Sequence, residues 1–245
     1  MTDIVKKNNS SELCATEKPQ LVALYSEQIF PFLAEKIGTL TTIPYFVELN
    51  KKQINTFLIG IYYFSNIIRH YSMLLATNLV RSENNSEIKG LSAALYKFNC
   101  ENKNYYEYFQ EFLLQFKTMQ FESYVNYYVT EDYYKRIAIT SHGDTLCNNL
   151  TKVVCEKPHI TSIASLITME YIFETINIKF NDYAKCINKS DSDVPIIKLP
   201  ETLSSSSILS HLLDGGDDRA DDIRFGILVT IEAFKIYFDE LAKIC

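Results

Sequence analysis

Glycine and proline are scarce in this chain, with seven Gly and six Pro among 245 residues. Folds built from many short strands need both residues at their turns, so the scarcity favours long helices over a turn-rich sheet. Hydrophobic residues make up 47% of the chain, enough for a sizeable core. No Pro/Gly/Ser-rich linker separates parts of different composition, so we expect one domain over residues 21–245, preceded by a polar arm at residues 1–20.

The charge balance and the hydropathy exclude two classes of partner. Asp and Glu outnumber Lys and Arg by 30 to 24, and no basic stripe is present that could follow a phosphate backbone, so nucleic acid is not expected as a partner. No apolar run reaches the ~18 residues that a membrane span needs, because Asn66, Arg69 and His70 interrupt the longest candidates. The polar N-terminus lacks the apolar core of a secretory signal, and we therefore expect a cytoplasmic protein without a membrane partner.

Several familiar chemistries lack their sequence motifs. The six cysteines form no C-x-x-C pair, which argues against a zinc site or a disulfide framework and favours reduced, buried thiols. There is no G-x-S-x-G, no Gly-rich phosphate loop and no H-E-x-x-H, so serine hydrolase, nucleotide-binding and zinc protease functions have no support. The cysteines are Cys14, Cys100, Cys147, Cys155, Cys186 and Cys245.

Apolar residues recur at helical spacing along most of the chain and predict an all-α bundle of seven or eight helices. In the first predicted helix, from Leu21, we expect Pro31 to introduce a kink and Gly38 to end the helix. A central helix is expected to start at the N-cap Asn50 and to end near Arg81. Two helices or one bent helix are expected over 105–134. Further helices are expected over 91–100, 131–154, 158–183, 206–213 and 217–243, with a surface loop over 188–207.

Two sequence signals mark helix boundaries in the second half of the chain. The helix over 131–154 could break at His142-Gly143, and Pro158 suits the first turn of the helix that follows. His142 and His159 thus fall at expected helix ends, and neither has a partner spacing that suggests catalysis. Adjacent acidic residues in the first turn of the last helix agree with the direction of the helix dipole.

Two stretches carry a resemblance to a known family. IPYFVELNKKQINTFLIGIYYFSNIIRHYSMLLA, at residues 43–76, resembles the bundle-crossing helix of heme-oxygenase-like proteins, and HITSIASLITMEYIFETINIKF, at residues 159–180, resembles their later core helix. Together with the last helix, they are similar to the superfamily of thiaminase II (TenA), PqqC and the CADD-like proteins, nearest to bacterial CADD-like proteins. The resemblance covers most of the chain from Leu21 and implies a heme-oxygenase-like helical bundle.

Metal-bearing members of that family bind two metal ions through Glu and His at i and i+7, a Glu on a second helix, and H-x-x-x-D-x-x-H on the last helix. Such ligands suit iron or manganese. The resemblance carries this pattern over to Tyr63 at the position of the first Glu, to His70 and Glu170, and to Asp214, Asp218 and Asp221. Tyr replaces the first Glu and Asp replaces both terminal His residues, so the ligand set is degenerate and the chain holds either Fe or Mn or no metal. A one-turn shift would bring in His211.

Each candidate also has a structural interpretation. His70 could satisfy a core hydrogen bond or lie at the helix surface, Glu170 could be buried with a partner, and the aspartates could form an N-cap and a solvated first turn. If the chain is an enzyme, the resemblance implies a non-heme iron or manganese oxidase acting on a small organic molecule in an internal pocket, with Tyr63 as a redox-active side chain. The alternative is a non-catalytic module that binds a small molecule or a protein.

Aromatic residues are concentrated between Tyr105 and Tyr134. The helices expected there carry more apolar surface than one core would use, and such surface is typical of an interface between subunits. We therefore expect a homodimer formed through this segment.

Overall fold

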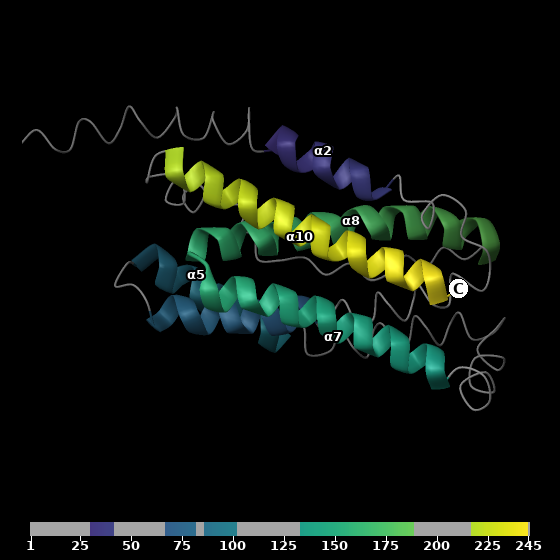
Figure 1. The fold of residues 1–245 in the computed structure, drawn as a ribbon. Helices are drawn as coiled ribbons and strands as arrows, with labels where there is room; N and C mark the ends of the chain where they lie inside the picture. The colour runs from purple at the N-terminus through teal and green to yellow at the C-terminus, as the bar shows by residue number, and fades with distance from the viewer. Residues whose placement is uncertain (1–29, 42–66, 82–85, 102–132, 189–216, 245) are drawn as a thin grey trace, which may run out of the picture.

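The computed structural model describes residues 30–41, 67–81, 86–101, 133–188 and 217–244, and nearly all of these residues are helical (Figure 1). The labelled helices are α2 (Phe30–Thr41), α5 (Ser86–Glu101), α7 (Tyr133–Glu156), α8 (His159–Asn188) and α10 (Asp217–Ile244). Residues 67–81 form a sixth helical segment, called helix 67–81 below. These ranges contain no strand, so the all-α prediction is confirmed for the described part of the chain, while the heme-oxygenase-like arrangement stays a prediction.

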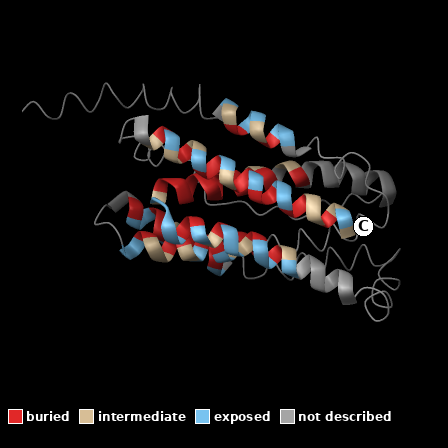
Figure 2. Cartoon of the chain, in the orientation of Figure 1, coloured by how far each residue is buried: buried red, intermediate tan, exposed pale blue. Residues whose placement is uncertain are grey.

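Helix α8 provides the centre of the fold. Every residue from 160 to 169 is buried, and this half of α8 is red in Figure 2. Its sequence there, ITSIASLITM, consists of apolar residues and small hydroxyl residues, and a helix without a polar face is buried on all sides. Helices α2, α7 and α10 all contact α8.

Helix α10 lies along α8 and also contacts α7 and α2 (Figure 1). Its buried side chains recur at helical spacing and include Ile223, Ile227 and Phe234, which belong to the same core cluster as the buried residues of α8. Near its C-terminal end the rings of Phe234 and Phe238 are 6.0 Å apart, within the range of favourable aromatic pairs. With helices on three sides, α10 keeps one exposed face.

Helix 67–81 pairs with α5 through both apolar and polar contacts. Its buried residues Ile68, Tyr71 and Leu75 follow the i, i+3, i+7 pattern that the sequence predicted for the central helix. Two hydrogen bonds then join it to α5, because the Ser92 hydroxyl donates to the carbonyl of Ala76 at 2.8 Å and the Asn99 amide donates to the Ser72 hydroxyl at 2.9 Å. Arg81 is helical and is the last described residue of this segment, so the predicted helix end near Arg81 stays a prediction.

Two glycines do not act as the sequence predicted. Gly38 lies inside α2, which continues to Thr41, so the prediction that Gly38 ends this helix is wrong. A glycine costs a helix only about 1 kcal/mol relative to alanine, and the burial of Leu33 and Ile37 on the same helix offsets that cost. Gly143 likewise lies inside α7, which runs without a break from Tyr133 to Glu156, and His142 is therefore not at a helix end.

Other boundaries agree more closely with the sequence. Helix α10 begins at Asp217 as predicted, and α8 begins at His159, directly after Pro158. Helix α5 begins at Ser86, five residues before the predicted start, so part of the polar stretch expected as a connection is helical. None of the described helices has a stretch long and apolar enough to cross a lipid bilayer.

Gly226 marks the closest approach of α10 to α8. A Cβ atom added there would collide with the carbonyl oxygen of Thr161 and would lie 3.1 Å from the Cβ of Ala164. Only a residue without a side chain allows the two helix backbones to approach this closely, so Gly226 sets the distance between α10 and the fully buried half of α8.

Gly226→Ala should therefore destabilise the protein by about 1–3 kcal/mol, because relief of the overlap with Thr161 must push the helices apart. Gly90→Ala is the matched control, since a Cβ at this exposed glycine of α5 meets nothing within 4 Å and should stabilise its helix by up to about 1 kcal/mol. Chemical denaturation of both variants measures the difference. Equal effects of the two substitutions would contradict the close packing at Gly226.

Candidate functional site

The described residues of the predicted ligand set lie at different depths. His70 is exposed on helix 67–81, and Asp221 is exposed on α10, where its carboxylate accepts a hydrogen bond from Arg224 at 3.1 Å. Glu170 is half-buried on α8, directly after the fully buried stretch of that helix. In this structure, two of the three side chains are thus directed toward solvent.

The side chains of the remaining candidate ligands lie outside the described part of the structure. Tyr63, Asp214 and His211 lie outside the described residues, as do the aromatic segment before Tyr133 and all of the predicted loop over 188–207 except Asn188, which ends α8. Asp218 belongs to the first turn of α10 by its backbone. Among the residues that the structure describes, no group of three or more His, Cys, Asp or Glu side chains could hold a metal ion. The convergence of the six predicted ligand positions on one metal site stays a prediction.

Tyr71, the residue after His70, is a polar side chain that helix 67–81 directs into the core, beside the buried Ser72. Its side chain is 1% exposed, and its hydroxyl donates to the backbone carbonyl of Ser162 on α8 at 3.0 Å. Burial raises the pKa of the Tyr71 phenol well above its ordinary value, and hydrogen bonds with Ser165 and Ser162 offset part of that rise. The phenol therefore stays neutral and acts as a hydrogen-bond donor.

The Tyr71 contact belongs to a buried hydroxyl layer, formed by Tyr71, Ser162, Ser165 and Thr230. Ser165 on α8 and Thr230 on α10 are fully buried, and their hydroxyl oxygens are 2.6 Å apart. Thr230 also donates to the carbonyl of Gly226 at 2.7 Å. A hydroxyl has one proton to donate, so Ser165 is the donor in the bond between the two side chains.

The hydroxyl layer is suited to holding helices in register. Its hydrogen bonds join neutral hydroxyls to one another and to backbone carbonyls, and Ser162 donates to the carbonyl of Val153 at 3.3 Å, which ties α8 to the end of α7. A neutral hydroxyl needs an adjacent base before it becomes a good nucleophile. Satisfied hydrogen bonds in a low-dielectric interior instead favour one packing arrangement over others.

The sequence analysis did not identify the hydroxyl layer. The available signal was the alternation of small hydroxyl residues with Ile and Leu on α8, at Thr161, Ser162 and Ser165. Such residues on an otherwise apolar helix must bond somewhere when buried, and nearby helix carbonyls are ready acceptors. The hydroxyl of Thr161, which is fully buried, has no hydrogen-bond partner in the described structure.

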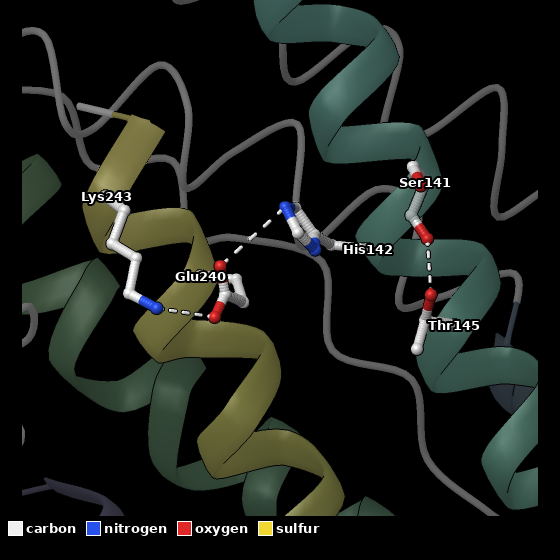
Figure 3. Close-up of polar contacts among 5 residues, drawn as sticks. All are labelled: Ser141, His142, Thr145, Glu240 and Lys243. Atoms are coloured by element: carbon white, nitrogen blue, oxygen red, sulfur yellow. Dashed lines mark hydrogen bonds and ion pairs between the residues drawn. The ribbon is translucent and has the colours of Figure 1, made fainter.

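A second cluster of polar side chains, formed by His142, Glu240 and Lys243, links α7 to α10 near the C-terminal end of the chain (Figure 3). Glu240 accepts a hydrogen bond from Lys243 on its own helix at 2.6 Å, and its other carboxylate oxygen lies 4.0 Å from Nε2 of His142 on α7. The hydrogen bond from Lys243 lowers the pKa of the Glu240 carboxyl, and the charges of Lys243 and His142 add to the effect. His142 thus strengthens a contact between the helices when it is protonated.

The three described cysteines are free thiols. Cys147 is half-buried, and burial raises the pKa of its thiol, which keeps it protonated and unreactive. Cys100 and Cys155 are exposed, so the prediction of buried thiols is wrong for these two positions. Cys100 lies on the solvent face of α5 and Cys155 on the solvent face of α7. A small side chain such as that of cysteine is tolerated at such positions because it makes no contact with the core.

Tyr71→Phe should destabilise the protein by about 1–2 kcal/mol, since it removes a buried hydrogen bond without changing the ring. Tyr96→Phe is the control, because the Tyr96 hydroxyl bonds Thr77 at 3.0 Å in a partly exposed place and its loss should cost less than about 1 kcal/mol. The difference between wild type and Tyr71→Phe should narrow above about pH 10, where the unfolded chain ionises its tyrosines while the folded phenol stays neutral. Urea denaturation from neutral to alkaline pH measures both effects. Equal losses in the two variants would contradict the buried role of Tyr71.

Glu240→Gln should lower the melting temperature at neutral pH and leave it nearly unchanged in acid. The lowered carboxyl pKa means that ionised Glu240 stabilises the fold above its ordinary titration range, and this contribution is lost as the pH falls through the lowered value. Thermal unfolding at a series of pH values, with Glu156→Gln at the exposed end of α7 as control, measures the effect. A difference between wild type and Glu240→Gln that does not change with pH would contradict this interpretation.

Comparison with known proteins gives no match: no family model, no curated protein and no solved structure matches the chain. The likeness to heme-oxygenase-like proteins therefore has its basis in the sequence pattern over residues 43–76 and 159–180 and in the last helix. The structure adds that the described residues form an all-α fold. Family membership stays an inference from those sequence features.

Proposed function

We propose that this chain is a non-catalytic protein-interaction module, which binds a protein partner through exposed apolar side chains on its helices. The observation that carries the proposal is the solvent exposure of His70 and Asp221, two residues that a core metal site would need in the interior. Asp221 already shares its carboxylate with Arg224 at the surface. A ligand set divided in this way favours binding over metal-dependent oxidation.

The exposed large hydrophobic residues give the interaction its surface. Met73 and Val80 are 41% and 53% exposed and lie seven residues apart, so they share one face of helix 67–81. A second set lies on α10 and comprises Phe225, Leu228 and Ile236. Single exposed hydrophobic residues are ordinary, whereas apolar side chains repeated along one helix face are a common means of helix-in-groove recognition.

The second candidate function is a metal-dependent oxidase of the CADD-like type. The observation that favours it is Glu170, a carboxylate held half-buried directly after the most buried stretch of α8. In this proposal Glu170 and His70, with Asp214, Asp218 and Asp221, bind Fe or Mn beside Tyr63, and a small organic molecule occupies an internal pocket. A cytoplasmic location and dimerisation through residues 105–134 stay predictions under either function.

Elemental analysis of protein expressed with added iron and manganese distinguishes the two functions. We expect no stoichiometric iron or manganese in wild-type protein and no change in metal content in His70→Ala or Glu170→Ala. Glu156→Ala, which removes an exposed carboxylate at the end of α7, is the matched control. Stoichiometric metal that is lost in His70→Ala and Glu170→Ala but retained in Glu156→Ala would establish a metal site at these residues, as the oxidase requires, and would contradict the non-catalytic proposal.

A further inference from the structure

The exposed face of α10 is a continuous row of side chains centred on Glu232. At 100° per residue, Phe225, Leu228 and Ile236 all lie within about 40° of the direction of Glu232. These three apolar residues are 44%, 43% and 50% exposed, and Glu232 is exposed between them. Because α2, α7 and α8 contact other sides of α10, this row faces away from the core. Exposed residues appear in pale blue along α10 in Figure 2.

The charges in this row are arranged symmetrically about Glu232 with opposite signs. Asp221 lies eleven residues before Glu232 and Lys243 lies eleven residues after it, and both are exposed. A row of charges that changes sign on reversal is complementary to a second copy of itself laid in the opposite direction.

We propose that a second copy of this chain docks antiparallel on the exposed face of α10, with Glu232 on the twofold axis. Asp221 then meets the partner's Lys243. Leu228 meets the partner's Ile236, so the apolar side chains of one copy cover those of the other. Lys235, three residues from the axis, lies within reach of the partner's Glu232, which relieves the repulsion between the two central carboxylates.

The surroundings of Phe225 are also complementary in charge to the partner in the antiparallel dimer. Phe225 lies seven residues before Glu232, and the ammonium of Lys157 is 5.1 Å from the centre of its ring. The residue seven positions after Glu232 is Asp239. Docking therefore brings the cation beside Phe225 toward the partner's Asp239, another pair of opposite charges.

A parallel arrangement is unfavourable for the same residues. A twofold axis along the helix would place each side chain opposite its own copy, so that Asp221 would face Asp221 and Lys243 would face Lys243. Like charges directly opposed cost binding energy, whereas the antiparallel dimer replaces them with opposite charges. Charge complementarity therefore selects one orientation of the second copy.

The interface is small, because each copy contributes one helix face with three apolar residues. Stable dimers bury roughly 800 Å² on each partner, more than one pair of helices of this length provides. The dimer should therefore be reversible and dissociate on dilution. The proposal extends the proposed interaction function by naming the partner. It uses the exposed surface of α10 and the neighbouring Lys157, so a metal-binding chain could dimerise in the same way.

Site-directed crosslinking tests the position of the twofold axis. Packed helices have axes about 8–10 Å apart and Cα atoms about 2.3 Å from each axis, so two Cα atoms on the dyad are within disulfide range. Glu232→Cys should form a bond between its two copies under mild oxidation, identified by mass mapping of the linked peptides. Lys89→Cys, exposed on α5, is the control. Linkage through residue 232 no faster than through residue 89 would overturn the proposal.

Charge reversal tests the pairing across the axis by sedimentation of the full chain over a range of concentrations. Asp221→Lys alone and Lys243→Asp alone should each weaken association about 5- to 30-fold, because two symmetry-related contacts are reversed. The double variant should recover most of the wild-type association, since every contact again joins opposite charges. Circular dichroism establishes that each variant is folded. A strictly monomeric wild type, or a double variant as weak as the single ones, would overturn the proposal, whatever the metal content.

Discussion

The close crossing of α8 and α10 at Gly226 is the constraint on which the described structure depends. The glycine brings the backbone of α10 against the Thr161 carbonyl, and this approach in turn allows the short side chains of Ser165 and Thr230 to meet at 2.6 Å. Larger residues at the crossing would separate the helices and leave buried hydroxyls without partners, at a cost for each. Apolar packing and polar bonding thus require the same distance between the helices.

The sequence predicted the class of the fold and the larger helices, because apolar periodicity reports which residues must leave water. The closing helix and the start of α8 after Pro158 were predicted within one residue. Gly38 and Gly143 were misjudged because a glycine lowers helix stability only modestly, and tertiary packing outweighs that cost. How the helices approach one another depends on contacts between distant residues, which no local pattern encodes.

The candidate site shows the limit of spacing as evidence. A separation of seven residues places Tyr63 and His70 on the same side of a helix but does not say which side faces the core. The apolar residues Ile68, Tyr71 and Leu75 decide that question, and they direct His70 outward. The small hydroxyl residues of α8 signal buried hydrogen bonds, but their partners could not be predicted because these come from separate helices, and only the fold brings Tyr71 to Ser162.

Amide hydrogen exchange tests the central role of the α8–α10 crossing most directly. We predict that the backbone amides around Thr161–Thr168 and Gly226–Thr230 exchange more slowly than any others. They should also become exposed together, because they open only when the whole fold opens. Amides of α5, whose outer face is solvated, should exchange sooner. If the amides at the crossing exchanged as fast as those of α5, the two helices could not be the core on which the rest of the structure depends.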